Sequence, residues 1–129
     1  MKIKYINPLL YSIVTNSLLY SKRNYQLNLK KRYFDLLFFL KKNNFLFFFK
    51  KNNKKLLIFL KFFENISIIK KIKIYKNLKK KKIFNLKKIL QIKKNNNFVF
   101  YIFYNKLGFL SINEVLKKRI GAFLIAKIF

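Results

Sequence analysis

Few side chains in this sequence could carry out acid–base, nucleophilic or metal chemistry. The 129 residues include no cysteine and no histidine, and the acidic residues are Asp35, Glu64 and Glu114. The lack of cysteine and histidine excludes a disulfide framework, a zinc site and a Cys or His nucleophile. Three isolated carboxylates cannot build a metal cluster, and a paired acid/base site would require distant positions to converge. We therefore expect no enzyme activity, no cofactor, no bound metal and no small-molecule substrate.

The abundant chemistry is that of lysine. The chain has 31 Lys and Arg against 3 Asp and Glu, a net charge of +28, while 53% of its residues are hydrophobic. A disordered basic tail would be poor in large apolar side chains, so the composition predicts a folded protein whose charge attracts polyanions. Nucleic acid and an anionic membrane surface are the competing partners. Membrane binding would favour one long basic amphipathic helix, whereas these basic residues are spread over the full length, which favours folded RNA.

The composition also indicates the kind of genome. Lys, Asn, Ile, Phe and Tyr number 28, 16, 17, 17 and 8, together 86 of the 129 residues, and AT-rich codons encode all five. Mutational pressure in a very AT-rich genome, such as that of an organelle, is the simplest cause. Individual Lys and Phe positions therefore carry less information than usual.

No stretch is long and apolar enough to predict a membrane span. The longest uncharged stretch, 5–21, contains Asn, Pro, Ser and Thr, whereas a spanning helix needs about 20 mainly apolar residues. The same segment is too polar for a secretory signal. Since the folding pattern begins by residue 7, we expect that an Arg- and Ser-rich transit peptide is absent or already removed.

Hydrophobic periodicity predicts the elements of the N-terminal part. Asn7-Pro8 is a typical helix start, and apolar residues at helical spacing extend this helix to about residue 20. The polar segment 21–28 is expected to form a loop, or a short strand around residues 25–29. An amphipathic pattern predicts a second helix over about 30–42, which Asn43 ends. Three short runs rich in Phe and Ile, which we expect to be strands, follow at 45–50, 55–63 and 66–75.

The next segments are more basic. The strongly basic composition of 76–82 predicts a solvated or RNA-facing loop. The pattern of 83–92 fits either a short helical turn or a strand. The polar patch 93–97 is typical of a turn. The unbroken apolar run 98–104 is typical of a buried strand, and Gly108 follows it in a loop.

The C-terminal end has the clearest local pattern. Ser111-x-x-Glu114 has the spacing of a capping box and predicts a short helix through about residue 119, which Gly121 ends. A final strand is expected over 123–129. The order of elements predicts an α+β fold. We expect an N-terminal half of helices and strands, 1–75, and a mainly β C-terminal half with a short capped helix, 76–129.

Three segments in this order carry a family resemblance: 7–15, 40–46 and 100–129. The first, beginning Asn7-Pro-Leu-Leu, looks like the Asp-Pro-Ile-Ala start of the bacterial-type eighth protein of the small ribosomal subunit. The second, ending Asn-Asn-Phe-Leu, is similar to its x-x-Gly-Phe-Ile. The third resembles the family's end, which has a strand, Ser-Thr-Ser-Lys-Gly, a short basic helix, Gly-Gly and a final apolar strand. The middle, 47–97, aligns poorly.

The resemblance implies direct binding to a helix in the central domain of small-subunit rRNA, through a loop near the C-terminus. Gly108 keeps the family's Gly, while Tyr104, Asn105 and Lys106 replace Ser, Thr and Ser. From the residues alone, Ser111 also fits a helix cap, Gly108 a turn, and Tyr104 the buried end of its strand. The residues expected to contact RNA are Tyr104, Asn105, Lys106, Gly108, Ser111, Lys117, Lys118, Arg119, Lys30 and Lys31.

We therefore expect an organelle-encoded protein of the small ribosomal subunit, in a mitochondrion or, as the second choice, in a plastid. Its expected partners are small-subunit rRNA and neighbouring small-subunit proteins. Many lysines would neutralise phosphates, and the loop 104–111 would recognise RNA shape. The alternative is a basic, membrane-associated organellar protein.

Overall fold

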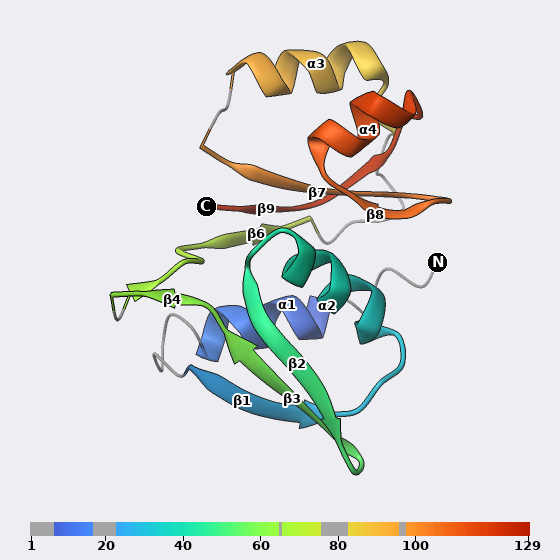
Figure 1. The fold of residues 1–129 in the computed structure, drawn as a ribbon. Coiled ribbons are helices and arrows are strands. Elements are labelled where there is room, and N and C mark those ends of the chain that lie inside the picture. The colour runs from blue at the N-terminus through green and yellow to red at the C-terminus, as the bar shows by residue number, and fades with distance from the viewer. Residues whose placement is uncertain (1–6, 17–22, 65, 76–82, 96–97) are drawn as a thin grey trace. The chain divides into compact units, whose positions relative to one another are not determined.

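The computed structural model describes residues 7–16, 23–64, 66–75, 83–95 and 98–129. Helices and antiparallel sheets occur side by side, so the predicted α+β class is confirmed (Figure 1). The chain divides into two compact units, unit 1 over Met1–Lys71 and unit 2 over Ile72–Phe129. The expected boundary after residue 75 moves to residue 71, because Ile72–Ile74 pairs with the last strand of the chain.

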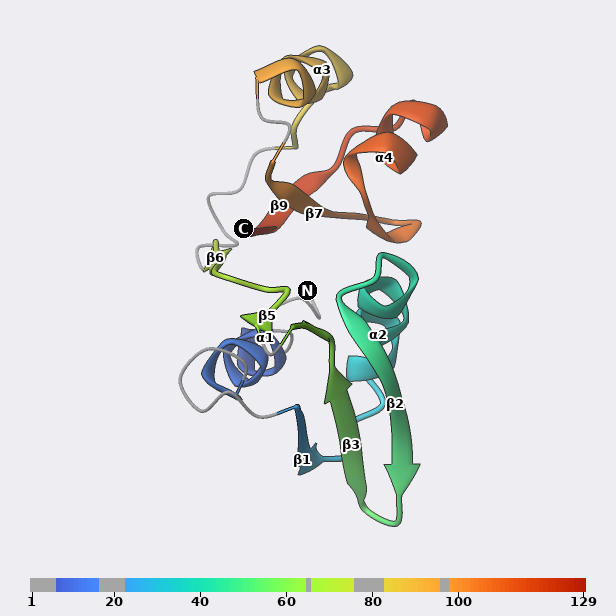
Figure 2. The same ribbon diagram turned by 60° about the vertical axis from the view of Figure 1, so that its left-hand side comes forward.

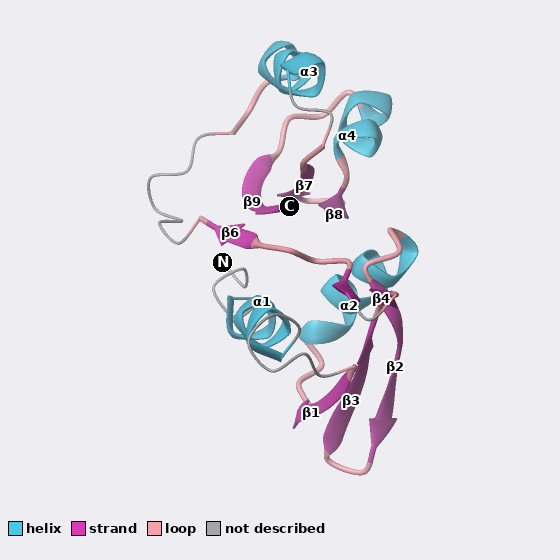
Figure 3. Ribbon diagram, turned by 90° about the vertical axis from the view of Figure 1, so that its left-hand side faces the viewer, coloured by secondary structure: helices cyan, strands magenta, loops and turns pink. Residues whose placement is uncertain are grey.

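Unit 1 is a small antiparallel sheet with two helices on one face. Its strands are ordered β1-β3-β2, and a separate short hairpin joins β4 to β5. Figure 3 shows both helices on the same side of the sheet. The elements are α1 (Asn7–Val14), β1 (Asn24–Asn28), α2 (Tyr33–Lys42), β2 (Leu46–Asn52), β3 (Lys55–Leu60), β4 (Phe62–Phe63) and β5 (Ile66–Ser67).

The core of unit 1 lies between the helices and the inner face of the sheet. Along β3 every second residue is buried, so one face points to the helices and the other does not. The Tyr25 hydroxyl lies 3.0 Å from the Ser12 hydroxyl and links β1 to α1. Burial raises the pKa of the Tyr25 hydroxyl. The fully buried side chains of unit 1 are Leu9, Leu10, Ile13, Leu36, Leu37, Leu40, Leu56, Ile58 and Ile69.

The first helix is shorter than its apolar pattern predicts. The α-helix ends at Val14 and a π-helical turn covers 15–16, while the remainder of the predicted helix lies outside the described residues. The Thr15 hydroxyl donates to the carbonyl of Tyr11 at 2.9 Å, and the Asn16 amide to that of Ser12 at 2.8 Å. These short polar side chains compete for the backbone carbonyls near the helix end.

The predicted strands at 55–63 and 66–75 are both broken. The first divides at Lys61 into β3 and β4, and the second divides into β5 and β6. Glu64, at φ 50°, turns the chain between β4 and β5, and the Ile68 amide donates to the Lys61 carbonyl at 3.2 Å. The apolar run therefore folds back on itself before it reaches unit 2.

Unit 2 is a four-stranded antiparallel sheet in the order β6-β9-β7-β8. Two helices cover one face of this sheet (Figures 1 and 3). Its elements are β6 (Ile72–Ile74), α3 (Leu86–Asn95), β7 (Phe100–Asn105), β8 (Gly108–Leu110), α4 (Ile112–Lys118) and β9 (Phe123–Ile128). The core between helices and sheet contains Ile89, Tyr101, Phe103, Leu110, Val115, Ala122 and Leu124.

The structure decides the open alternative at 83–92 in favour of a helix. The Asn85 side chain accepts from the Lys88 amide at 2.9 Å, as an N-cap does, and α3 runs on to Asn95. The predicted turn at 93–97 is therefore wrong over 93–95, which form the last helical turn. Phe98, predicted to begin a buried strand, is 96% exposed, and β7 begins at Phe100. The predicted basic loop 76–82 lies outside the described residues.

Gly121 allows two backbone segments to approach closely. A Cβ atom there would lie 2.8 Å from the Phe84 carbonyl oxygen and 2.9 Å from Ile83 Cγ2. Phe84 and Ala122 form an isolated antiparallel bridge at this point, with N···O distances of 2.9 and 3.3 Å. Gly108 differs, because its φ of 105° demands glycine although a Cβ atom would meet nothing within 4 Å.

We predict that Gly121→Ala pushes residues 83–84 away from the sheet and lowers the free energy of unfolding by about 1–3 kcal/mol. Hydrogen exchange of the Phe84 and Ala122 amides should accelerate in this variant. Gly108→Ala is the matched control, because its strain is confined to the β7–β8 turn. Equal exchange of the two amides in both variants would contradict the steric role of Gly121.

Candidate nucleic-acid interface

The predicted recognition loop 104–111 is a β-hairpin. Asn105 pairs with Gly108, and Lys106 and Leu107 form the turn between β7 and β8. Gly108 is therefore the first residue of β8 and not a loop residue, and its positive φ lets the chain reverse here. Because a hairpin turn has a defined backbone conformation, the backbone position of Lys106 is defined by the pairing of β7 with β8.

Asn105 is a structural residue of this hairpin. Its side chain is 8% exposed. Its Oδ1 accepts from the Leu107 amide at 2.8 Å, and its Nδ2 donates to the Gly121 carbonyl at 3.3 Å. Both polar atoms of the Asn105 side chain are thus hydrogen-bonded within the protein, one to the turn and one to the segment before β9. The expectation that Asn105 contacts RNA does not fit this placement.

Ser111 is likewise used within the protein. It is 9% exposed, and its hydroxyl accepts from the Glu114 amide at 3.4 Å. The Glu114 carboxylate accepts from the Ser111 amide at 3.4 Å and lies 3.2 Å from the Ser111 hydroxyl. The predicted capping box is confirmed. Of the two alternatives for Ser111, the geometry favours the helix cap over an RNA contact.

Tyr104 is partly exposed and packs beside an aromatic neighbour. It pairs across the hairpin with Phe109, and the two ring centroids are 5.0 Å apart. Tyr104 is thus neither fully buried nor isolated at the surface. Its ring could stack on a base only as part of this pair.

Four exposed cations occur in the same hairpin and helix as these structural residues. Lys117 and Lys118 lie in the last turn of α4, and Arg119 is its C-cap, with φ 55° and its amide donating to the Val115 carbonyl. Lys106 lies at the hairpin turn. Figures 1 and 2 both show the hairpin turn and the C-terminal end of α4 toward the same side of unit 2. We call Lys106, Lys117, Lys118 and Arg119 the hairpin–helix cluster.

The remaining two predicted contacts are not part of this cluster. Lys30 and Lys31 are exposed residues of unit 1 that precede α2. The Lys30 ammonium lies 5.9 Å from the centroid of the Tyr33 ring. They are candidate contacts of unit 1.

The structure also brings together two lysines that the sequence analysis did not select. Lys73 of β6 and Lys127 of β9 are directly paired across the sheet. Their ammonium groups lie 5.4 and 5.9 Å from the centroid of the Tyr75 ring. Like charges placed opposite each other are unfavourable without an anion. In the sequence, each of these two strands has a single Lys between apolar residues, and this pattern is the signal from which the pair could have been suspected.

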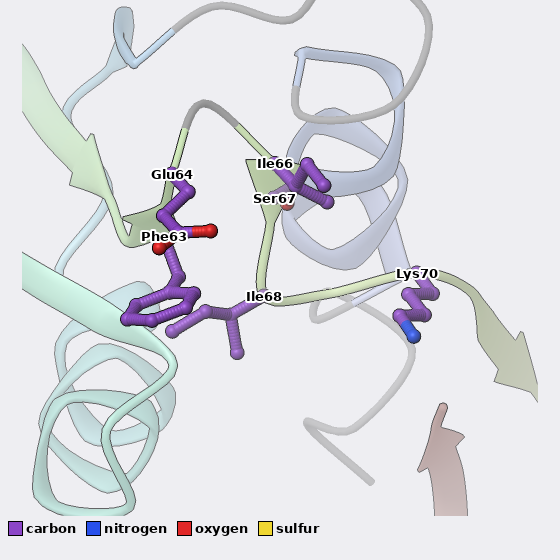
Figure 4. A pocket seen from close by; sticks show the side chains of 6 residues that line it. All are labelled: Phe63, Glu64, Ile66, Ser67, Ile68 and Lys70. Atoms are coloured by element: carbon purple, nitrogen blue, oxygen red, sulfur yellow. The ribbon is translucent and has the colours of Figure 1, made fainter.

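One hollow occurs in unit 1 beside the β4–β5 hairpin. It has a volume of about 330 Å³ and is lined by Phe63, Glu64, Ile66, Ser67, Ile68 and Lys70. Figure 4 shows Lys70 apart from the other labelled side chains. Within the described ranges, no group of three acidic residues could hold a metal ion. The hollow therefore offers a mainly apolar surface and no metal centre.

We predict that Asn105→Ala lowers the free energy of unfolding by about 1–3 kcal/mol, because it removes both hydrogen bonds of a buried side chain and leaves the part-buried Gly121 carbonyl without this donor. Lys106→Ala is the neighbouring control and should change stability by less than about 0.5 kcal/mol, since the side chain is exposed. Urea unfolding at high salt measures both. If Lys106→Ala were as destabilising as Asn105→Ala, the separation into structural and surface residues would fail.

Comparison with known proteins adds no assignment to this geometry. Neither the models of known protein families nor the sequences of curated proteins match the chain. The function must therefore be argued from the hairpin–helix cluster, the charge and the sequence resemblance.

Proposed function

We propose that this chain is an RNA-binding protein of the small ribosomal subunit of an organelle, in a mitochondrion or, as the second choice, in a plastid. The hairpin–helix cluster is the observation that carries the proposal. Its four exposed cations belong to the β7–β8 turn and to the C-terminal end of α4, two elements whose ends lie toward the same side of unit 2. Glu114 is the one carboxylate residue in the sequence of unit 2, and it is held in the capping box.

The charge supports an extended RNA partner. Unit 1 has sixteen basic and two acidic residues, and unit 2 has fifteen and one, so each has a net charge of +14. Phosphate neutralisation with release of counterions supplies affinity without catalysis. Since Asn105 and Ser111 are occupied inside the protein, recognition falls to the cations and to the Tyr104–Phe109 pair. These features suit the shape and the phosphates of a folded RNA helix.

The ribosomal part of the proposal depends on the resemblance at the two ends of the chain. Pro8 opens α1, Gly108 begins β8, and Gly121 stands at the close approach to residues 83–84. Each of these landmarks has a definite physical task in the fold. Their order and spacing support small-subunit rRNA, in its central domain, and neighbouring small-subunit proteins as partners.

Membrane association is the competing explanation of the charge. Among the described residues, no helix is both long and apolar enough to cross a membrane. The alternative to be tested is therefore that the same lysines attach the protein to the surface of an anionic membrane.

We predict that replacing Lys106, Lys117 and Lys118 together by Gln weakens binding to a central-domain rRNA fragment at least about tenfold and lowers the salt slope by about 2–3. Gln keeps the helix propensity of Lys, so α4 should persist. The control replaces Lys87, Lys93 and Lys94, exposed residues of α3, by Gln. Filter binding across a salt series measures both variants. Equal losses would refute recognition through the hairpin–helix cluster.

A second prediction concerns the particle in which the protein occurs. After lysis of purified organelles, the protein should sediment with small-subunit rRNA, and nuclease treatment or high salt should release it, because phosphate contacts are salt-sensitive. Quantitative immunoblotting of gradient fractions measures this. Persistence in alkaline-washed membranes would favour the membrane alternative and contradict the ribosomal proposal.

A further inference from the structure

The outer face of the unit 1 sheet combines aromatic, amide and basic side chains. The inner face is filled by buried residues such as Leu56 and Ile58. Among the described elements of unit 1, the helices α1 and α2 lie on that inner side (Figure 3). The strand register places the outward residues in three cross-strand rows, Asn24–Phe59–Phe48, Gln26–Leu57–Lys50 and Asn28–Lys55–Asn52.

Three aromatic rings gather at one end of this face. Phe48 and Phe59 stack with ring centroids 4.1 Å apart and an interplanar angle of 15°. Phe47, beside them at the bulge in β2, is 64% exposed, and its ring centroid lies 5.3 Å from that of Phe48. Phe48 and Phe59 are half-buried and each ring covers one face of the other, whereas the Phe47 ring is largely exposed. A base can cover the ring faces that remain open.

Polar and basic groups continue the face beyond the rings. Asn24, Gln26 and Asn28 are exposed, as are Lys50 and Lys55. The Lys55 ammonium donates to Asn28 Oδ1 at 2.7 Å, which holds the lysine along the sheet. The sequences of β1, β2 and β3 contain no acidic residue. The face therefore offers ring stacking, amide hydrogen bonds and positive charge within one sheet.

We propose that this face, the Phe48–Phe59 platform, binds unpaired bases of RNA. A base stacks on the ring pair, the amides bond to base edges, and Lys50 and Lys55 contact the phosphates on either side. A lipid surface fits less well, because burying the amides of Asn24 and Gln26 against acyl chains would leave them without partners. The site lies in unit 1, and the proposal does not depend on the hairpin–helix cluster or on a ribosomal role.

The test uses the full chain and an unstructured ten-nucleotide oligouridine at about 0.3 M salt, where bulk electrostatics are screened. The variant Phe48→Leu with Phe59→Leu keeps apolar volume and removes the rings. We expect its affinity, measured by fluorescence anisotropy, to fall about tenfold or more. The control, Phe34→Leu with Phe38→Leu, changes two phenylalanines of α2 that pack on Phe49 and should lose less than about threefold.

Further arms make each outcome decisive. The double Phe48/Phe59 variant should bind the central-domain rRNA fragment like the wild type, so failure of this proposal is distinguishable from failure of the proposed function. Should that variant not fold, photocrosslinking of 4-thiouridine oligonucleotide to the wild-type chain replaces it, and crosslinks in β2 and β3 are expected. Three results would overturn the proposal. The first is an unchanged affinity for oligouridine, the second is crosslinks outside β2 and β3, and the third is a loss confined to the binding of anionic vesicles or of protein.

Discussion

Each unit of this protein carries fourteen uncompensated positive charges, so its apolar core must hold together a body whose surface repels itself. The described cores contain no lysine or arginine, and the buried polar residues there are Asn105 and Ser111. Both are fully engaged, one at the hairpin and one at the α4 cap. The cations are thus confined to positions where water or a polyanion can reach them. The three carboxylates of the sequence are too few to offset this repulsion, so a bound polyanion would stabilise both units.

Much of the fold followed from local patterns. The capping box at Ser111, the amphipathic second helix and the final strand were all predicted within a few residues, because each depends on side chains close in sequence. The failures have a different origin. The helix expected to reach residue 20 leaves its α form after Val14, where Thr15 and Asn16 bond to backbone carbonyls. The run 66–75 is divided because its two ends pair with different partners, β4 and β9. Periodicity carries no information on such pairing.

The structure separates the predicted site residues into exposed and structural ones. Lys106 and the basic residues at the end of α4 are exposed, as an RNA contact would require. By contrast, Asn105 was expected at the RNA surface, and its side chain points inward to the Gly121 carbonyl. That contact joins residues sixteen positions apart, which no motif spacing reveals. The Lys73–Lys127 pair was overlooked for the same reason, since it exists only through the register of β6 on β9.

The two proposed surfaces divide RNA recognition according to what each unit can present. Unit 2 offers cations on a hairpin and at a helix end, where the carboxyl-terminal dipole also favours positive charge. Such point charges suit phosphates and carry little base information. Unit 1 offers flat rings with amides around them, and these distinguish an unpaired base from a paired one. A sequence dominated by Lys, Asn, Ile, Phe and Tyr supplies both kinds of surface, because Lys fits the first and Phe with Asn the second. Compositional drift toward these residues is therefore compatible with RNA binding, provided that Gly108 and Gly121 keep the backbone of unit 2 in place.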